Sequence, residues 1–209
     1  APASALPPGQ AARPASLSEL ATRTAAALRA AGTTTVTLGI DDSLFTGPRL
    51  APGWPTTYVT SGVVSPVSAL SADSGKVSAT ALTRDADPAL AAGRYFAGRL
   101  EAAGITVTGS VARTAAAAGA AEVAAVQSPT VGELVERTLT MSDNDLAEAL
   151  AHLAGKATGK GGSFAGGSAA VGAMLEALGI EADGARIVDG SGLSRLDLVP
   201  AAAITATLT

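Results

Sequence analysis

A short unit of helix, glycine and strand recurs along this chain, and it limits the folds that the chain can adopt. In the first unit Ser16 begins a helix as a capping-box serine, with Glu19 three residues further on. Apolar side chains follow at helical spacing until Gly32, which supplies the left-handed residue that ends many helices. Residues 35–40 then alternate between polar and apolar side chains, as a half-buried strand does.

Two further copies of this unit are predicted. The second begins at Asp87, with a proline at the first helical position, and leads to a strand at residues 105–111. The third begins around Ser168 and leads to a short strand at residues 187–188. Three such units predict an α+β fold in which helices cover layers of sheet.

An alanine-rich run at residues 115–121 predicts a boundary between two domains. A second capping box, Thr130 with Glu133, follows this run and marks the start of another helix. We therefore predict a sandwich-like accessory domain at residues 1–125 and a helix-rich, sheet-backed domain at residues 126–209.

Composition excludes several classes of function. The chain has no cysteine and a single histidine, His152, and its carboxylates are not clustered, so we expect no metal and no cofactor. A net charge of -4 with scattered basic residues argues against nucleic-acid binding. No apolar run approaches the roughly 18 residues that a membrane helix needs. Residues 1–10 are rich in proline and alanine, which predicts a linker or an opened loop rather than an intact signal peptide.

The tripeptide Ser142-Asp143-Asn144 lies between two predicted helices, and it has two interpretations. The structural one is helix capping, in which Ser142 pairs with Asp145 at the start of the second helix, residues 145–153. The catalytic one is the Ser-X-Asn element of penicillin-recognising hydrolases. In that chemistry a hydroxyl relays a proton and an amide contacts a lysine and the substrate carbonyl, while Asp143 points away and caps the helix.

A second motif, Asp-Gly-Ser-Gly-Leu-Ser-Arg, occupies residues 189–195. Taken alone, Gly-Ser-Gly is typical of a turn in which the backbone takes unusual angles or approaches another group closely.

The order of the two motifs resembles the class C low-molecular-mass penicillin-binding proteins, which are D-alanyl-D-alanine carboxypeptidases and endopeptidases. The upstream stretches at residues 51–55 and 65–70 are also similar to that family's accessory domain, so the resemblance covers nearly the whole chain. It implies part of a transpeptidase-like, β-lactamase-type domain with an accessory α+β domain inserted in it. It also implies peptidoglycan stem peptides and β-lactams as ligands, and an extracytoplasmic location: secreted, periplasmic or bound to the cell wall.

By this resemblance, Ser142 and Asn144 are catalytic. The substrate-binding residues that it implies belong to the second motif, with Arg195 either orienting the motif or approaching the stem peptide: Ser191, Gly192, Leu193 and Arg195. The structural alternative for Arg195 is a salt bridge to Asp189 or Asp197.

Two motifs of that family are missing. None of the three lysines has a serine three residues before it, and residues 156–159, Lys-Ala-Thr-Gly, only approximate Lys-Thr-Gly. In the family the first motif lies upstream of everything found here and the second lies downstream. We therefore expect a fragment that is inactive by itself and has the remaining segments of the same peptidase as partners. A natural pseudoenzyme would need two independent losses.

Other functions fit less well. The glycines and lysines at residues 155–161 do not have Walker A spacing, and His152 has no Gly-X-Ser-X-Gly element to serve. A class A β-lactamase would need a Glu-X-X-Leu-Asn segment after Asn144, and none is present. The alternative that stays open is a non-catalytic module that binds or supports the cell wall.

Overall fold

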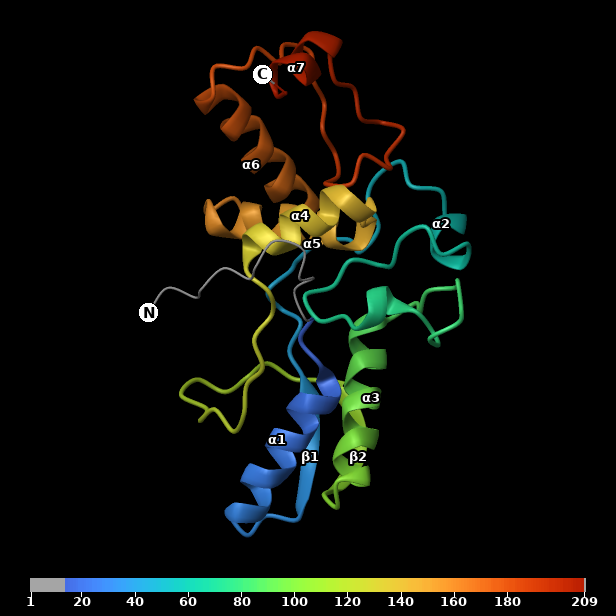
Figure 1. Cartoon of the computed structure of the whole chain (residues 1–209), viewed down its shortest axis with the longest axis vertical. Helices are drawn as coiled ribbons and strands as arrows, with labels where there is room; N and C mark the ends of the chain where they lie inside the picture. The colour runs from blue at the N-terminus through green and yellow to red at the C-terminus, as the bar shows by residue number, and fades with distance from the viewer. Residues whose placement is uncertain (1–13, 209) are drawn as a thin grey trace.

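The computed structural model describes residues 14–208, and it is elongated, with two parts along its long axis (Figure 1). The lower part contains both strands and the helices α1 and α3, and the upper part contains α4 to α7. The predicted linker at residues 1–10 lies outside the described residues.

The lower part is built as the first two units predict. Helix α1 (Leu17–Ala30) precedes strand β1 (Thr35–Ile40), and helix α3 (Pro88–Ala102) precedes strand β2 (Thr106–Arg113). The strands are parallel, with Thr35 opposite Thr106 and an irregularity between Thr37 and Gly39. The chain returns from β1 to β2 through α3, as a parallel pair requires.

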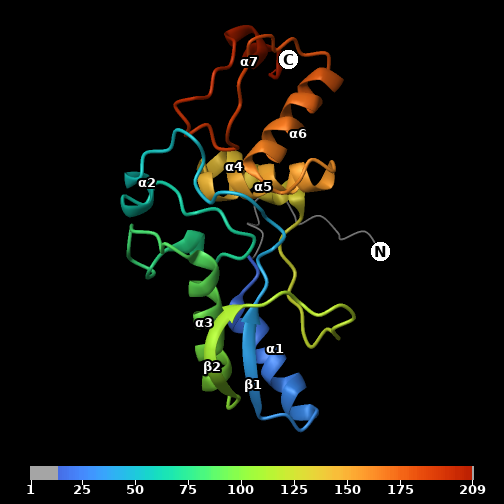
Figure 2. The same ribbon diagram turned by 180° about the vertical axis from the view of Figure 1, so that it is seen from behind.

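Helices α1 and α3 cover one face of the two-stranded sheet, and Figure 2 shows the other face uncovered. The buried core of this part is Ala21, Ala25, Leu100 and Ile105. Alanine at the two α1 positions fits α1 closely against α3 and the strands. The second sheet of the predicted sandwich is absent from the described residues, because both available strands pair in a single sheet.

The long connection between β1 and α3 packs against the upper part. It contains helix α2 (Thr57–Thr60) and the short 3₁₀ helix η1 (Asp73–Gly75). Its apolar residues Ala51, Trp54 and Val64 share a buried cluster with Phe164 of the upper part. Residues assigned to the accessory domain therefore contribute to a core that includes a residue of the upper part.

The upper part is helical. It comprises α4 (Val131–Met141), α5 (Asn144–Ala157), α6 (Phe164–Ala177) and α7 (Ala201–Ala206). Gly155 of α5 lies against the backbone of Gly166, at a spot where a methyl group would come within 2.6 Å of the Gly166 carbonyl carbon. This contact needs glycine, because any side chain would push the two helices apart.

Two local predictions were wrong here. The third unit ends in no strand, since residues 187–188 follow only an isolated antiparallel bridge between Arg186 and Leu198. Helix α5 begins at Asn144 and continues to Ala157, so it extends beyond the predicted end at residue 153 and includes Lys156. Strand pairing needs a partner at the right distance, and local alternation does not provide one.

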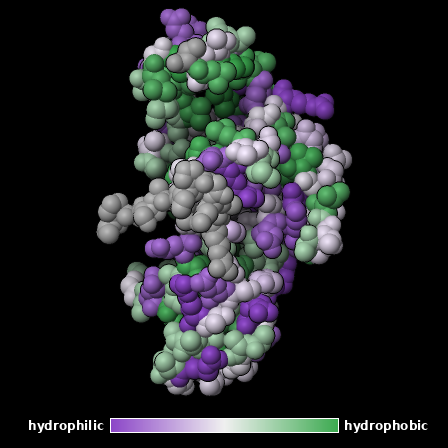
Figure 3. Space-filling model, viewed as in Figure 1, coloured by the Kyte–Doolittle hydropathy of each residue, from purple (hydrophilic) through white to green (hydrophobic). Residues whose placement is uncertain are grey.

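Apolar side chains gather at the top of the molecule, where Figure 3 shows green residues over α6 and α7. Met174, Leu178 and Ile204 are among the large apolar side chains exposed there. The lower part shows more hydrophilic residues on the same face. Within residues 14–208, no helix combines the length and the hydropathy needed to cross a membrane.

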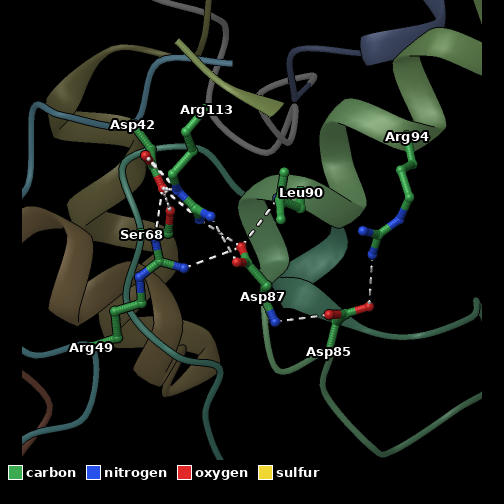
Figure 4. A network of polar contacts seen from close by, with 8 residues as sticks. All are labelled: Asp42, Arg49, Ser68, Asp85, Asp87, Leu90, Arg94 and Arg113. Carbon is green, nitrogen blue, oxygen red and sulfur yellow. Dashed lines mark hydrogen bonds and ion pairs between the residues drawn. The ribbon is translucent and has the colours of Figure 1, made fainter. Parts of the chain in front are cut away.

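A network of ion pairs connects the ends of both strands to α3 and to the long connection. Arg113 bridges Asp42 and Asp87, and Arg49 reaches the same two carboxylates (Figure 4). We call these four residues the strand-end network. The hydrogen bond to Arg113 is the main cause that lowers the pKa of both carboxyls.

Candidate active site

Ser142 occupies the corner between α4 and α5. It ends α4 with left-handed backbone angles, φ 52° and ψ 46°, which are uncommon for a residue other than glycine. The side chain is exposed, and no described residue hydrogen-bonds its hydroxyl. A strained backbone that holds a free hydroxyl at a helix corner is a feature that functional sites often show.

Asp143, rather than Ser142, caps α5. Its carboxylate accepts a hydrogen bond of 3.1 Å from the Leu146 backbone N–H and lies 3.6 Å from the Arg137 guanidinium. The predicted role of Asp143 as a cap is confirmed. The capping pair of Ser142 with Asp145 was wrong, because the N-cap of α5 is Asp143, one residue later than that pairing requires.

Asn144 is the first residue of α5, and its amide is held by the long connection. Its Nδ2 donates to the Val63 carbonyl at 3.1 Å. The next residue, Asp145, accepts from the Ser65 backbone N–H at 2.7 Å. The first turn of α5 is therefore fixed to residues 63–65, more than seventy positions earlier in the chain.

Glu148, one turn further along α5, holds the second motif. Its buried carboxylate accepts from the backbone N–H groups of Gly190, at 3.0 and 3.1 Å, and of Ser191, at 2.9 Å. Gly190 lies directly on α5, since a methyl group there would come within 2.5 Å of the Ala151 Cβ. Glycine is required at this close approach. The Ser-Asp-Asn corner and residues 189–195 therefore meet on the same helix.

Asp189 shapes the second motif from inside. One oxygen accepts from Gly192 N–H at 2.7 Å, and the other accepts from Ser194 N–H and from Trp54 Nε1, each at 2.7 Å. The Ser194 hydroxyl in turn donates to the Pro52 carbonyl at 2.7 Å. The stretch at residues 51–55 that resembles the family's accessory domain is thus the support of this loop.

The predicted substrate-binding residues take different positions around this loop. Gly192 and Arg195 are exposed, whereas Ser191 and Leu193 are half-buried. Leu193 packs on the cluster of Trp54 and Phe164. No described acid forms an ion pair with Arg195, so neither Asp189 nor Asp197 makes the alternative salt bridge.

Burial dominates the electrostatics of α5. Loss of solvent raises the pKa of Glu148, and the hydrogen bonds from Ser191 and Gly190 oppose that rise. Burial also raises the pKa of Asp145, against the effects of the Ser65 hydrogen bond and the Arg84 charge. His152 packs between Phe45 and Phe164, with the Phe164 contact edge-to-face, and burial lowers its pKa. His152 is thus a packing residue.

Glu148 was missed by the interpretation of the motifs. A signal for it exists: Asp145, Glu148 and His152 recur at helical spacing on one face of a helix whose other residues are mostly alanine and leucine. In the structure this polar stripe faces inward, since Glu148 and His152 are both 1% exposed. The described residues contain no group of three or more acids and histidines that could hold a metal.

Comparison with known proteins decides the family. The model of the D-Ala-D-Ala carboxypeptidase 3 (S13) family matches residues 13–86 and 79–209. The chain belongs to this family. S13 membership confirms the predicted resemblance to penicillin-binding carboxypeptidases. The matched residues include both the lower and the upper part of the molecule.

Among S13-like relatives, Carboxypeptidase Rv3627c of Mycobacterium tuberculosis is 34% identical over 185 residues, which is 87% of this chain and 39% of that protein. Carboxypeptidase DacB of Mycolicibacterium smegmatis is 34% identical, over 80% of this chain and 36% of that protein. The D-alanyl-D-alanine carboxypeptidase of Actinomadura sp. is also 34% identical, over 68% of this chain and 27% of that protein. The chain thus spans less than two fifths of the length of these relatives.

A solved structure supports the fold. Penicillin binding protein 4 from Haemophilus influenzae superposes with a TM-score of 0.74 at 20% identity, covering 90% of this chain and 57% of that chain. The predicted α+β class, with part of a penicillin-binding-protein fold, is confirmed.

Proposed function

We propose that this chain forms part of a serine-type D-alanyl-D-alanine carboxypeptidase or endopeptidase that acts on peptidoglycan stem peptides and is acylated by β-lactams. The observation that carries the proposal is the meeting of two motifs on α5. Asn144 begins the helix, and Glu148, one turn later, holds residues 189–195. The exposed hydroxyl of Ser142 stands at the corner beside them.

The proposed mechanism is acyl transfer. A serine outside this chain attacks the carbonyl of the penultimate D-alanine, and the peptide bond breaks as the terminal D-alanine leaves. A lysine outside this chain takes the proton of that serine. Ser142 passes a proton to the departing amine, since a hydroxyl can accept and donate in one step.

Asn144 complements Ser142 in this scheme. Because its Nδ2 donates to the Val63 carbonyl, its Oδ1 is the group free to accept a hydrogen bond from the lysine ammonium or from substrate. Nδ2 carries two protons, so the amide can also donate to the substrate carbonyl while it donates to Val63 O.

The proposed ligands and location follow from the same family. Stem peptides and β-lactams are the expected ligands, with residues 191–195 beside the substrate, and the expected location is outside the cytoplasm. Residues that supply the nucleophile and the Lys-Thr-Gly strand are the expected partners, because neither motif occurs in this sequence.

Labelling with a fluorescent penicillin tests the proposal. In the full-length product of the gene, Ser142→Ala or Asn144→Ala should slow acylation by ~10-fold or more, while the protein stays folded. Ser110→Ala, an exposed serine of β2, is the matched control and should acylate at the normal rate. Normal acylation in both site variants would remove Ser142 and Asn144 from the catalytic machinery.

The same experiment separates the enzyme from a wall-binding module. The 209-residue chain alone should not be labelled, because it contains no Ser-X-X-Lys nucleophile. A full-length product that binds stem peptide but is never acylated would instead establish the non-catalytic module.

A further inference from the structure

The orientation of the Asn144 amide depends on a carbonyl from the long connection. Its Nδ2 donates to Val63 O at 3.1 Å, and no described residue donates to its Oδ1. Turning the amide over would place oxygen against oxygen, so the position of Val63 O selects one of the two orientations. Contacts that fix the position of Val63 therefore also fix the orientation of the Asn144 amide.

Residues on both sides of Val63 are held by one ion pair. Arg84 donates from Nη2 to the Gly62 carbonyl at 2.9 Å, and the same atom lies 3.7 Å from the Asp145 carboxylate. Asp145 accepts from the Ser65 backbone N–H at 2.7 Å. The side chain of Val64 between these contacts is fully buried. The hydrogen bonds of Arg84 to Gly62 and of Asp145 to Ser65 thus fix both ends of residues 62–65.

The Arg84–Asp145 ion pair is largely buried, and few other groups compensate its charges. The side chains of Arg84 and Asp145 are only 10% and 18% exposed. No described residue accepts a hydrogen bond from Nε or Nη1 of Arg84, although both atoms are buried. Removing either partner of such a pair leaves a buried charge without compensation, which is costly.

We propose that Arg84 and Asp145 are positioning residues for the Ser-Asp-Asn motif, which clamp residues 62–65 so that Val63 O holds the Asn144 amide in its working orientation. The inference rests on the proposed function for its catalytic consequence, but not for its structural part. Arg84 does not contact substrate in this scheme, because its unpaired nitrogens are inaccessible to solvent. It acts from the long connection on a residue sixty positions later in the chain.

The first test needs no activity. Asn144 is the sole asparagine of the chain, so selective ¹⁵N-asparagine labelling gives one side-chain amide pair in the NMR spectrum of the 209-residue protein. Its exchange with water should accelerate roughly 5-fold in Arg84→Met, since one hydrogen bond loses its fixed acceptor. Arg84→Lys, which keeps the charge but cannot reach both oxygens, should give a smaller acceleration.

Arg94→Met is the matched control. Arg94 pairs with Asp85 at 3.6 Å, close to the separation of the proposed pair, but it is 57% exposed and contacts no part of α5. Its removal should leave the Asn144 amide exchange unchanged. Equal exchange in wild type, Arg84→Met and Arg84→Lys would overturn the clamp, and unfolding of Arg84→Met would leave Arg84→Lys to decide.

The second test measures catalysis in the full-length product. Arg84→Met should slow penicillin acylation ~10-fold, yet cause no further loss in an Asn144→Ala background, because it acts through that amide. Additive losses in the double variant would overturn the positioning role. If nothing is acylated while the amide exchange still responds to Arg84→Met, the proposed function fails and the clamp stands.

Discussion

Two sets of buried or half-buried charges occupy this molecule, and they are built in opposite ways. In the strand-end network, Arg113 and Arg49 surround Asp42 and Asp87, so that each acid has at least two cationic partners. On α5, by contrast, Asp145 pairs with one arginine, Arg84, at 3.7 Å, and Glu148 forms no ion pair and accepts from backbone N–H groups. The pKa of both acids falls in the first set and rises in the second.

The difference separates the structural strand-end network from the candidate site. The strand-end network has two arginines for two acids, and it stabilises the junction of the strands, α3 and the long connection. Its arginines keep both acids ionised. Carboxylates that are buried with few cations keep a raised pKa, which is a pattern that functional sites often show. The α5 acids are also the ones that hold the two motifs together.

The largest effect is expected at Glu148. Glu148→Ala leaves the buried N–H groups of Gly190 and Ser191 without an acceptor, which should lower the free energy of unfolding by ~3 kcal/mol. Glu148→Gln keeps one acceptor oxygen and removes a poorly compensated charge, so its cost should be ~1 kcal/mol or less. Urea unfolding of the 209-residue chain measures both.

Glu136→Ala on the exposed side of α4 is the control for Glu148 and should change stability by under ~0.5 kcal/mol. If Glu148→Ala were as mild as Glu136→Ala, the two motifs would not depend on α5 for their contact.

A smaller effect is expected in the strand-end network. Arg113→Met leaves Asp42 and Asp87 facing each other with Arg49 as their shared cation. It should cost only ~1 kcal/mol, because solvent screens the partly exposed Arg113 side chain. Arg94→Met should cost ~0.5 kcal/mol or less, because its pair is isolated and exposed. Added salt should weaken the Arg113 contribution, whereas it should hardly alter that of Glu148.

The pH dependence of stability should have opposite signs in the two sets. Asp87 has a folded-state pKa below its ordinary value of 3.8, so its contribution is present above that value and is lost as pH falls below it. Glu148 has a folded-state pKa above its ordinary value of 4.5, so stability rises as pH falls toward that value. The chain should therefore be most stable in mildly acidic solution.

Variants show which acid causes the loss of stability on each side of the pH of maximum stability. Asp87→Asn should flatten the loss at low pH by ~1 kcal/mol, and Glu148→Gln should flatten the rise from neutral pH by a similar amount. Urea unfolding across a pH series tests this. A wild-type stability that falls steadily from neutral pH downwards would contradict the assignment on α5.

Much of the local structure could be predicted from particular residues. The alternation at residues 35–40 matches β1, and the capping box of Thr130 with Glu133 is present at the start of α4. Asp87 caps α3 and Asp143 caps α5, as short-range hydrogen bonding predicts. The prediction of a strand at residues 187–188 was wrong, because a strand needs a neighbouring strand to pair with, and short-range patterns do not show whether one is present.

By itself, the sequence determined where most helices begin and which family its two motifs resemble, because caps, periodicity and motif spacing act over a few residues. Only the tertiary structure decided that Glu148 joins the two motifs and that Arg84 reaches Asp145. Those contacts join residues 42 or more positions apart. Their energy comes from burying charge beside the right partner, which depends on how the chain packs and not on which residues are neighbours along it.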